Sequence, residues 1–60
     1  MFTLKAIAAL FPAYATILVH GAGQGARMSA GDIAQDWADR IVKTIIPLDA
    51  YLVEIVVEGD

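Results

Sequence analysis

Residues 17–26 read I-L-V-H-G-A-G-Q-G-A, an apolar run that meets a single histidine and then a glycine-rich segment. The conformation of the apolar run decides the fold. A membrane helix that ends at the glycines predicts a mainly α-helical protein, whereas a buried strand that ends there predicts an α/β protein.

The composition favours the membrane helix. The chain has 60 residues, of which 58% are hydrophobic and 18% charged, where an ordinary globular protein has about 45–50% and about 25%. A domain of this size cannot bury so much apolar surface, so we expect the excess to face lipid, other copies of the chain or a larger membrane or virion complex. The absence of cysteine excludes disulfides and thiolate metal sites. A net charge of −3 without a basic stripe argues against a nucleic-acid partner.

The charged residues divide the chain into an apolar half and an acidic half. Lys5 is the one charged side chain before Arg27. The segment 1–23 is long enough to cross a membrane as a helix, with a kink at Pro12. The predicted organisation is a hydrophobic, membrane-embedded helix at 1–23, a glycine-rich hinge at 24–28, and an amphipathic helix with a short apolar segment at 29–60.

Residues 29–46 carry the clearest helical pattern. Ser29 is a suitable N-cap, and Pro47 is expected to end the helix. A large apolar side chain recurs at every fourth position, which places one apolar stripe along the helix. We predict that this stripe is an assembly interface, formed by Ile33, Trp37, Ile41 and Ile45.

Residues 50–58 fit either a helix or a strand. Tyr51, Val53, Ile55 and Val57 would line one face of a strand, and the segment is rich in β-branched residues. A helix through the same residues would also present an apolar stripe. A strand is favoured only if a partner strand exists, because a lone exposed strand is prone to aggregate.

The glycine-rich segment has two interpretations. Glycine adopts positive φ at helix ends, so Gly21, Gly23 and Gly25 are predicted to form a hinge after the first helix. Alternatively, Gly21, Gly23 and Ala26 fit the dinucleotide fingerprint G-x-G-x-x-A, in the sequence order of a single βαβ unit. That alternative is an α/β fold that binds a nucleotide or anion at Gly21–Gly25, although the predicted helix begins several residues after the turn.

The letters L-V-H-G-A-G-Q-G-A also resemble the oxyanion-loop region of α/β-hydrolases, in which H-G-x-G follows a core strand. The family's nucleophile motif G-x-S-x-G is absent, Ser29 is the only serine, and no second histidine can serve as a base. We therefore assign no catalytic residue and expect that the chain is not an enzyme.

The main functional prediction is a small single-pass membrane or membrane-derived subunit, located at the membrane, with a structural or accessory role. It would act by self-assembly or by docking into a larger complex. A third alternative is a secreted peptide, because Lys5, the apolar run and Gly23-Gln24-Gly25 fit a signal sequence at 1–25. No cofactor is expected; the one candidate ligand, for a haem or pigment, is His20.

Overall fold

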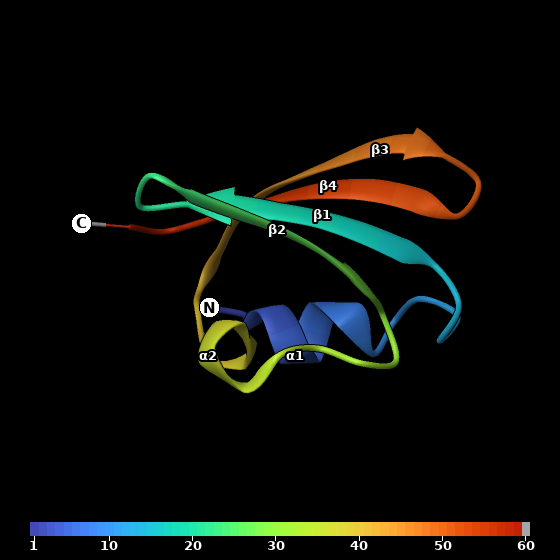
Figure 1. Cartoon of the computed structure of the whole chain (residues 1–60), viewed down its shortest axis with the longest axis horizontal. Coiled ribbons are helices and arrows are strands. Elements are labelled where there is room, and N and C mark those ends of the chain that lie inside the picture. The colour runs from blue at the N-terminus through green and yellow to red at the C-terminus, as the bar shows by residue number, and fades with distance from the viewer. Residues whose placement is uncertain (60) are drawn as a thin grey trace.

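The chain folds into a mixed β-sheet with two short helices on one face (Figure 1). This computed structural model describes residues 1–59. The helices are α1 (Leu4–Ala8) and α2 (Gln35–Ala38); the strands are β1 (Thr16–Gly21), β2 (Gln24–Ser29), β3 (Val42–Asp49) and β4 (Leu52–Val57). Strand makes up 47% of the chain and helix 15%, so the predicted mainly α fold is wrong.

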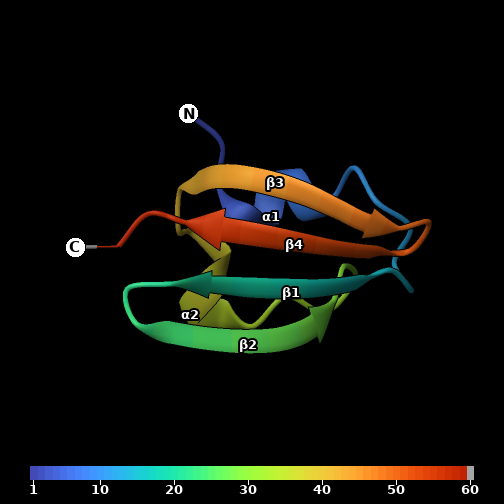
Figure 2. The same cartoon turned by 90° about the horizontal axis from the view of Figure 1, so that it is seen from above.

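The strand order is β2-β1-β4-β3 (Figure 2). β1 and β2 form one antiparallel hairpin, and β3 and β4 form another. The two hairpins join through parallel pairing of β1 with β4 at the centre of the sheet. The sequence left residues 50–58 open between a helix and a strand. Residues 52–57 form a strand, because β4 has a partner strand on each side.

Alternating side chains explain why β1 and β4 occupy the centre. Ile17 and Val19 of β1 and Val53 and Ile55 of β4 point toward the helices and are at most 3% exposed. Their β-branched side chains suit a pleated surface packed on one side. Val57 of β4 is also buried, and the rest of the core comes from both helices and the adjoining segments, including Leu4, Ile7, Ala15, Ala30 and Trp37.

The first helix is much shorter than the sequence pattern indicated. Thr3 caps α1 by accepting a hydrogen bond from the backbone N–H of Ala6 at 3.2 Å. The helix ends at Ala8, and the chain reaches Pro12 in an irregular segment. Among residues 1–59, no helix has both the length and the apolar character needed to cross a membrane. The predicted membrane-embedded helix at 1–23, and the single-pass membrane subunit built on it, are therefore wrong.

The predicted helix at 29–46 is also wrong, since only Gln35–Ala38 is α-helical there. Ser29 ends β2 instead of capping a helix, and its carbonyl accepts a hydrogen bond from the N–H of Asp32. The residues I-V-K-T-I-I at 41–46 are rich in β-branched side chains, and pairing with β4 draws most of them into β3. Pro47 lies within β3, which is permitted because β3 is an edge strand.

The glycine-rich segment forms the turn of the first hairpin. Ala22 has φ of 54° and Gly23 has φ of 76°, and Gly21 pairs with Gln24 across a two-residue loop. Two successive positive φ values are typical of a type I′ turn, whose twist matches that of paired strands. The α/β alternative is thus closer to the structure than the main prediction, because β1 and β4 are parallel and α2 lies in their connection. The turn, however, leads into β2 and gives a phosphate no helix N-terminus.

Candidate protein-interaction surfaces

Large apolar side chains remain exposed on and around β3. Ile45, Ile46 and Leu48 of this strand are 42%, 40% and 49% exposed. The backbone carbonyl of Phe2 accepts a hydrogen bond from the N–H of Val42, which places the exposed Phe2 at the start of the same strand. Tyr51 lies in the β3–β4 turn and contacts Tyr14. We call this set the β3 border: Phe2, Tyr14, Ile45, Ile46, Leu48 and Tyr51.

The β3 border is exposed on both faces of the sheet, because the helix layer is too small to cover β3 on one face and no layer covers the other. Ile45 pairs with Ile55 in the sheet, and Ile55 is fully buried. Each helix is only four or five residues long, and β3 rises away from both in Figure 1. Ile45 therefore stays exposed on the helix side, whereas Ile46 pairs with Glu54 and is exposed on the open face of the sheet. Every residue from Lys43 to Asp49 is exposed. An uncovered apolar strand of this kind is typical of a docking surface.

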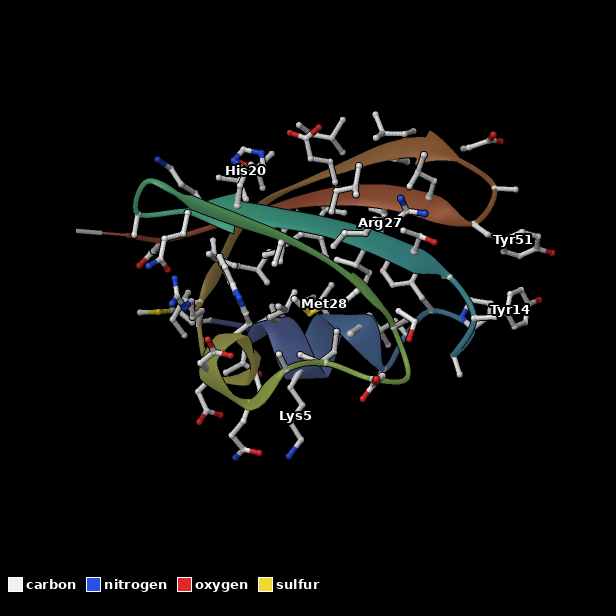
Figure 3. The ribbon with its side chains drawn as sticks, viewed as in Figure 1. Lys5, Tyr14, His20, Arg27, Met28 and Tyr51 are labelled. Atoms are coloured by element: carbon white, nitrogen blue, oxygen red, sulfur yellow. The ribbon has the colours of Figure 1, made fainter. Side chains whose placement is uncertain are left out.

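Tyr14 and Tyr51 form an aromatic pair at one end of the β3 border. Their ring centroids are 5.0 Å apart and the planes cross at 61°, an edge-to-face arrangement (Figure 3). A hydrogen bond with the Tyr51 side chain and, to a lesser extent, burial raise the pKa of Tyr14 above the usual value for tyrosine. Tyrosine is enriched at protein interfaces because it combines a large apolar ring with a polar tip.

The sheet face opposite the helices is not covered by another layer in the described residues (Figure 1). His20 of β1 and Glu54 of β4 meet there, with Nε2 of the imidazole 2.6 Å from Oε2 of the carboxylate. The pair is solvent-accessible, and no serine or threonine hydroxyl hydrogen-bonds to His20 within residues 1–59. This arrangement supplies neither a nucleophile nor a water-excluding pocket for catalysis.

The described residues also offer no metal site and no buried polar binding group. No cluster of three or more histidine or carboxylate side chains that could hold a metal ion occurs in the described part of the chain. The Nε2 atom of His20, the candidate haem or pigment ligand, is engaged by Glu54. A pocket between the helices is lined mainly by small residues with exposed Lys5, Gln35 and Asp39 around it. Since no buried polar or charged side chain faces it among residues 1–59, it lacks the convergent polar groups that orient a small ligand.

The four residues predicted as one interface stripe lie in four different places. Trp37 is 6% exposed and belongs to the core, whereas Ile33 and Ile41 are half-buried on either side of α2. Only Ile45 lies on the β3 border. The three predicted hinge glycines, Gly21, Gly23 and Gly25, lie in or beside the first hairpin turn.

The sequence pattern did not identify Phe2, Tyr14, Ile46, Leu48 and Tyr51 as surface residues. Pro47, within a β-branched run, was the available signal, because proline inside a strand indicates an edge. An edge strand rich in isoleucine predicts an exposed apolar surface that includes its neighbours.

Comparison with known proteins identifies no relative. No family model matches the chain, and no curated protein or solved structure matches it.

Proposed function

We propose that the chain is a small, non-catalytic self-association module in which two copies pair through the β3 border. The observation that carries the proposal is the uncovered apolar strand, with Ile45, Ile46 and Leu48 all at least 40% exposed. Removing such side chains from water stabilises an assembly by about 25 cal/mol per Å² of apolar area.

The size of the molecule is compatible with such an interface. A standard protein interface takes about 800 Å² from each partner, which is roughly one fifth of the 3910 Å² accessible surface of the chain. β3 is the longest strand, with eight residues, and it runs along one margin of the sheet (Figure 2). The exposed rings of Phe2, Tyr14 and Tyr51 extend the apolar area beyond both ends of this strand.

The charges along β3 favour pairing of two identical strands in opposite directions. Lys43 lies near the start of β3 and Asp49 at its end. A two-fold axis across the middle of the strand would place each Lys43 near the second copy's Asp49. These attractions would offset part of the repulsion between two chains that each carry a net charge of −3.

Side-chain packing, and not a continuous hydrogen-bonded ladder, would hold the two copies together. Pro47 has no N–H to donate, and β3 deviates from regular pairing between Val42 and Thr44 and again between Pro47 and Asp49. These irregularities interrupt a ladder along the outer edge. They leave the apolar side chains of the β3 border accessible.

Sedimentation equilibrium over a range of concentrations tests the proposal. The wild-type chain is expected to form a dimer, and Ile45→Lys to remain monomeric because it places a charge in the apolar contact. Leu10→Lys is the matched control, since Leu10 is 79% exposed but lies outside the β3 border. Circular dichroism verifies that both variants keep the wild-type strand content.

A charge exchange tests the orientation. Lys43→Asp is expected to weaken the dimer, and the double variant Lys43→Asp, Asp49→Lys is expected to restore it. A wild-type chain that stays monomeric at all concentrations, or an Ile45→Lys variant that dimerises like the wild type, would contradict the proposal.

A further inference from the structure

The two edges of the sheet differ in how they are protected. At the β3 edge, Thr3 pairs with Ile41 and Phe2 accepts a hydrogen bond from Val42, so the N-terminal residues cover the start of the strand. Pro47 and two register shifts interrupt the remainder. β2 contains no proline, its pairing with β1 is unbroken from Gln24 to Ser29, and no other element lies beside its outer edge in Figure 2. Proline and bulges are two of the devices that discourage strand addition, and the described part of β2 has neither.

The free backbone groups of β2 follow from its hydrogen-bonding pattern. The N–H of Ala30 donates a hydrogen bond to the backbone carbonyl of Ala15. The N–H of Thr16 donates to the backbone carbonyl of Tyr51, which precedes β4. The backbone N–H and C=O groups of successive residues point to opposite sides of a strand, so those of Gln24, Ala26 and Met28 form hydrogen bonds with β1. The N–H and C=O groups of Gly25 and Arg27 and the N–H of Ser29 then point to the open edge, and no hydrogen bond within residues 1–59 occupies them.

Arg27 gives this edge a charge preference. Its side chain is exposed on the open face of the sheet, and it forms no ion pair with any described residue (Figure 3). β2 contains no acidic residue, although the whole chain is acidic. We propose that β2 is a strand-addition site for an extended, acid-bearing segment of another protein, with a carboxylate opposite Arg27.

A second copy of β2 is a poor occupant of this edge. In the antiparallel registers that place the free groups of two β2 strands opposite one another with most of their length overlapping, Arg27 would face Gly25, Arg27 or Ser29 of the second copy. The two guanidinium groups would lie directly opposite or one diagonal step apart, and like charges in such positions destabilise pairing. An acid at the position opposite Arg27 has the reverse effect.

Gly25 indicates the size of the neighbouring residue in the bound segment. A Cβ at this position would make only ordinary contacts, at 3.7 Å to the carbonyl oxygen of Val19 and 3.8 Å to Cβ of His20. The open face beside His20 is therefore unfilled, and a large aromatic residue opposite Gly25 can occupy it. The alternate positions of the bound segment would lie beside Ala26 and Met28, which pack against the core. The preferred antiparallel segment thus has the order polar, apolar, acidic, apolar, aromatic.

A synthetic peptide tests the inference. The probe is Ser-Thr-Val-Glu-Val-Phe-Ser, and its control replaces the glutamate with lysine. Binding of the probe to the full chain is followed by amide NMR shifts and hydrogen exchange. The expected result is slower exchange of the amides of Gly25, Arg27 and Ser29, with affinity for the lysine control about fivefold or more weaker.

A charge exchange separates recognition by Arg27 from nonspecific binding. Arg27→Glu is expected to lose affinity for the glutamate peptide and to bind the lysine peptide better than the wild type does. Gly25→Pro removes one free N–H, as Pro47 does on β3, and is expected to weaken both peptides while circular dichroism stays unchanged. If Gly25→Pro fails to fold, the Arg27→Glu comparison alone decides the result.

The strand-addition site and the β3 border can be tested independently. Ile45→Lys is expected to leave peptide binding unchanged, because Ile45 lies on the opposite edge of the sheet. Three results would overturn the inference: no binding of the glutamate peptide, protection that maps to β3 instead of β2, or equal affinity of Arg27→Glu and wild type for that peptide. Self-association that Gly25→Pro abolishes and Ile45→Lys does not would assign the β2 edge to a second copy and would also overturn it.

Discussion

His20 and Glu54 lie 34 positions apart in the chain, yet their side chains meet at 2.6 Å on the open face of the sheet. The parallel pairing of β1 and β4 brings them together, since Leu18 is opposite Glu54 and His20 is opposite Val56. The contact is therefore a diagonal one between adjacent strands. Because both side chains remain partly exposed, solvent weakens their attraction.

Two neighbouring residues of β4 are expected to respond very differently to substitution. Glu54→Gln should change the free energy of unfolding by less than about 1 kcal/mol, as for other exposed ion pairs. Ile55→Ala should cost about 2–5 kcal/mol, because Ile55 is fully buried in the core. Urea unfolding followed by circular dichroism measures both. Equal losses would show that the His20–Glu54 contact is more than a surface pair.

The three glycines of the first hairpin are expected to differ when each is changed to alanine. Gly21→Ala would place Cβ in conflict with the backbone of Val57, and Gly23→Ala would hold alanine at a φ of 76°. The second strain costs about 1–2 kcal/mol. Gly25→Ala meets only ordinary contacts and should be nearly neutral. Thermal unfolding of the three variants checks the order, and a Gly25→Ala variant as unstable as Gly21→Ala would contradict it.

Tyr51→Phe is expected to lower the pKa of Tyr14 toward the usual value for tyrosine, because it removes the hydrogen bond that contributes most to the shift. A raised pKa means that the folded chain holds the Tyr14 proton more tightly than the unfolded chain. The associated stability is present below the usual tyrosine pKa and is lost as the pH rises through the raised value. Ultraviolet titration of tyrosinate measures this directly, since Tyr51→Phe leaves one tyrosine in the chain. A Tyr14 that titrates as late in the variant as in the wild type would contradict this assignment.

Trp37 is expected to stabilise the fold mainly through burial, with a smaller contribution from Arg40. Trp37→Ala should cost about 3–5 kcal/mol, as for other buried aromatic residues. The Cζ atom of Arg40 lies 4.1 Å from the centre of the Trp37 ring, so Arg40→Met should remove a cation–π contact that contributes about 0.5–1 kcal/mol. Denaturant unfolding provides both values. A loss for Arg40→Met as large as that for Trp37→Ala would assign the main role to the charge.

The sequence predicted the positions of the apolar segments better than their conformations. The spacing of Ile33, Trp37, Ile41 and Ile45 is compatible with a helix, but the same stretch contains Ile41, Val42, Thr44, Ile45 and Ile46, which favour strands. Local patterns could not decide between them, because the decisive factor is pairing with β4, which follows later in the chain. The same dependence left residues 50–58 open. The alternative of a buried strand before the glycines is confirmed by β1, which begins at Thr16.

The candidate surfaces were harder to predict than the fold. The high apolar content correctly indicated that part of the surface would remain uncovered, as the exposures of Phe2 and Leu48 show. Which side chains remain exposed depends on the short helix layer on one face and the uncovered sheet on the other, and no periodicity in the sequence reveals either. No local sequence pattern marks Arg27 as a binding residue. Its proposed role depends on the position of β2 at an open edge of the sheet.

The parallel ladder between β1 and β4 has a consequence for dividing the chain. A cut between Asp32 and Ile33 gives one fragment with α1 and the first hairpin, and another with α2 and the second hairpin. Each fragment would hold only part of the core, including Ile17 in one and Ile55 in the other, and an isolated hairpin is at best marginally stable in water. Neither fragment should fold alone, while mixing them should restore the sheet without a peptide bond between them. The chain is thus a natural candidate for a split reporter, in which reconstitution signals that two fused proteins have come together.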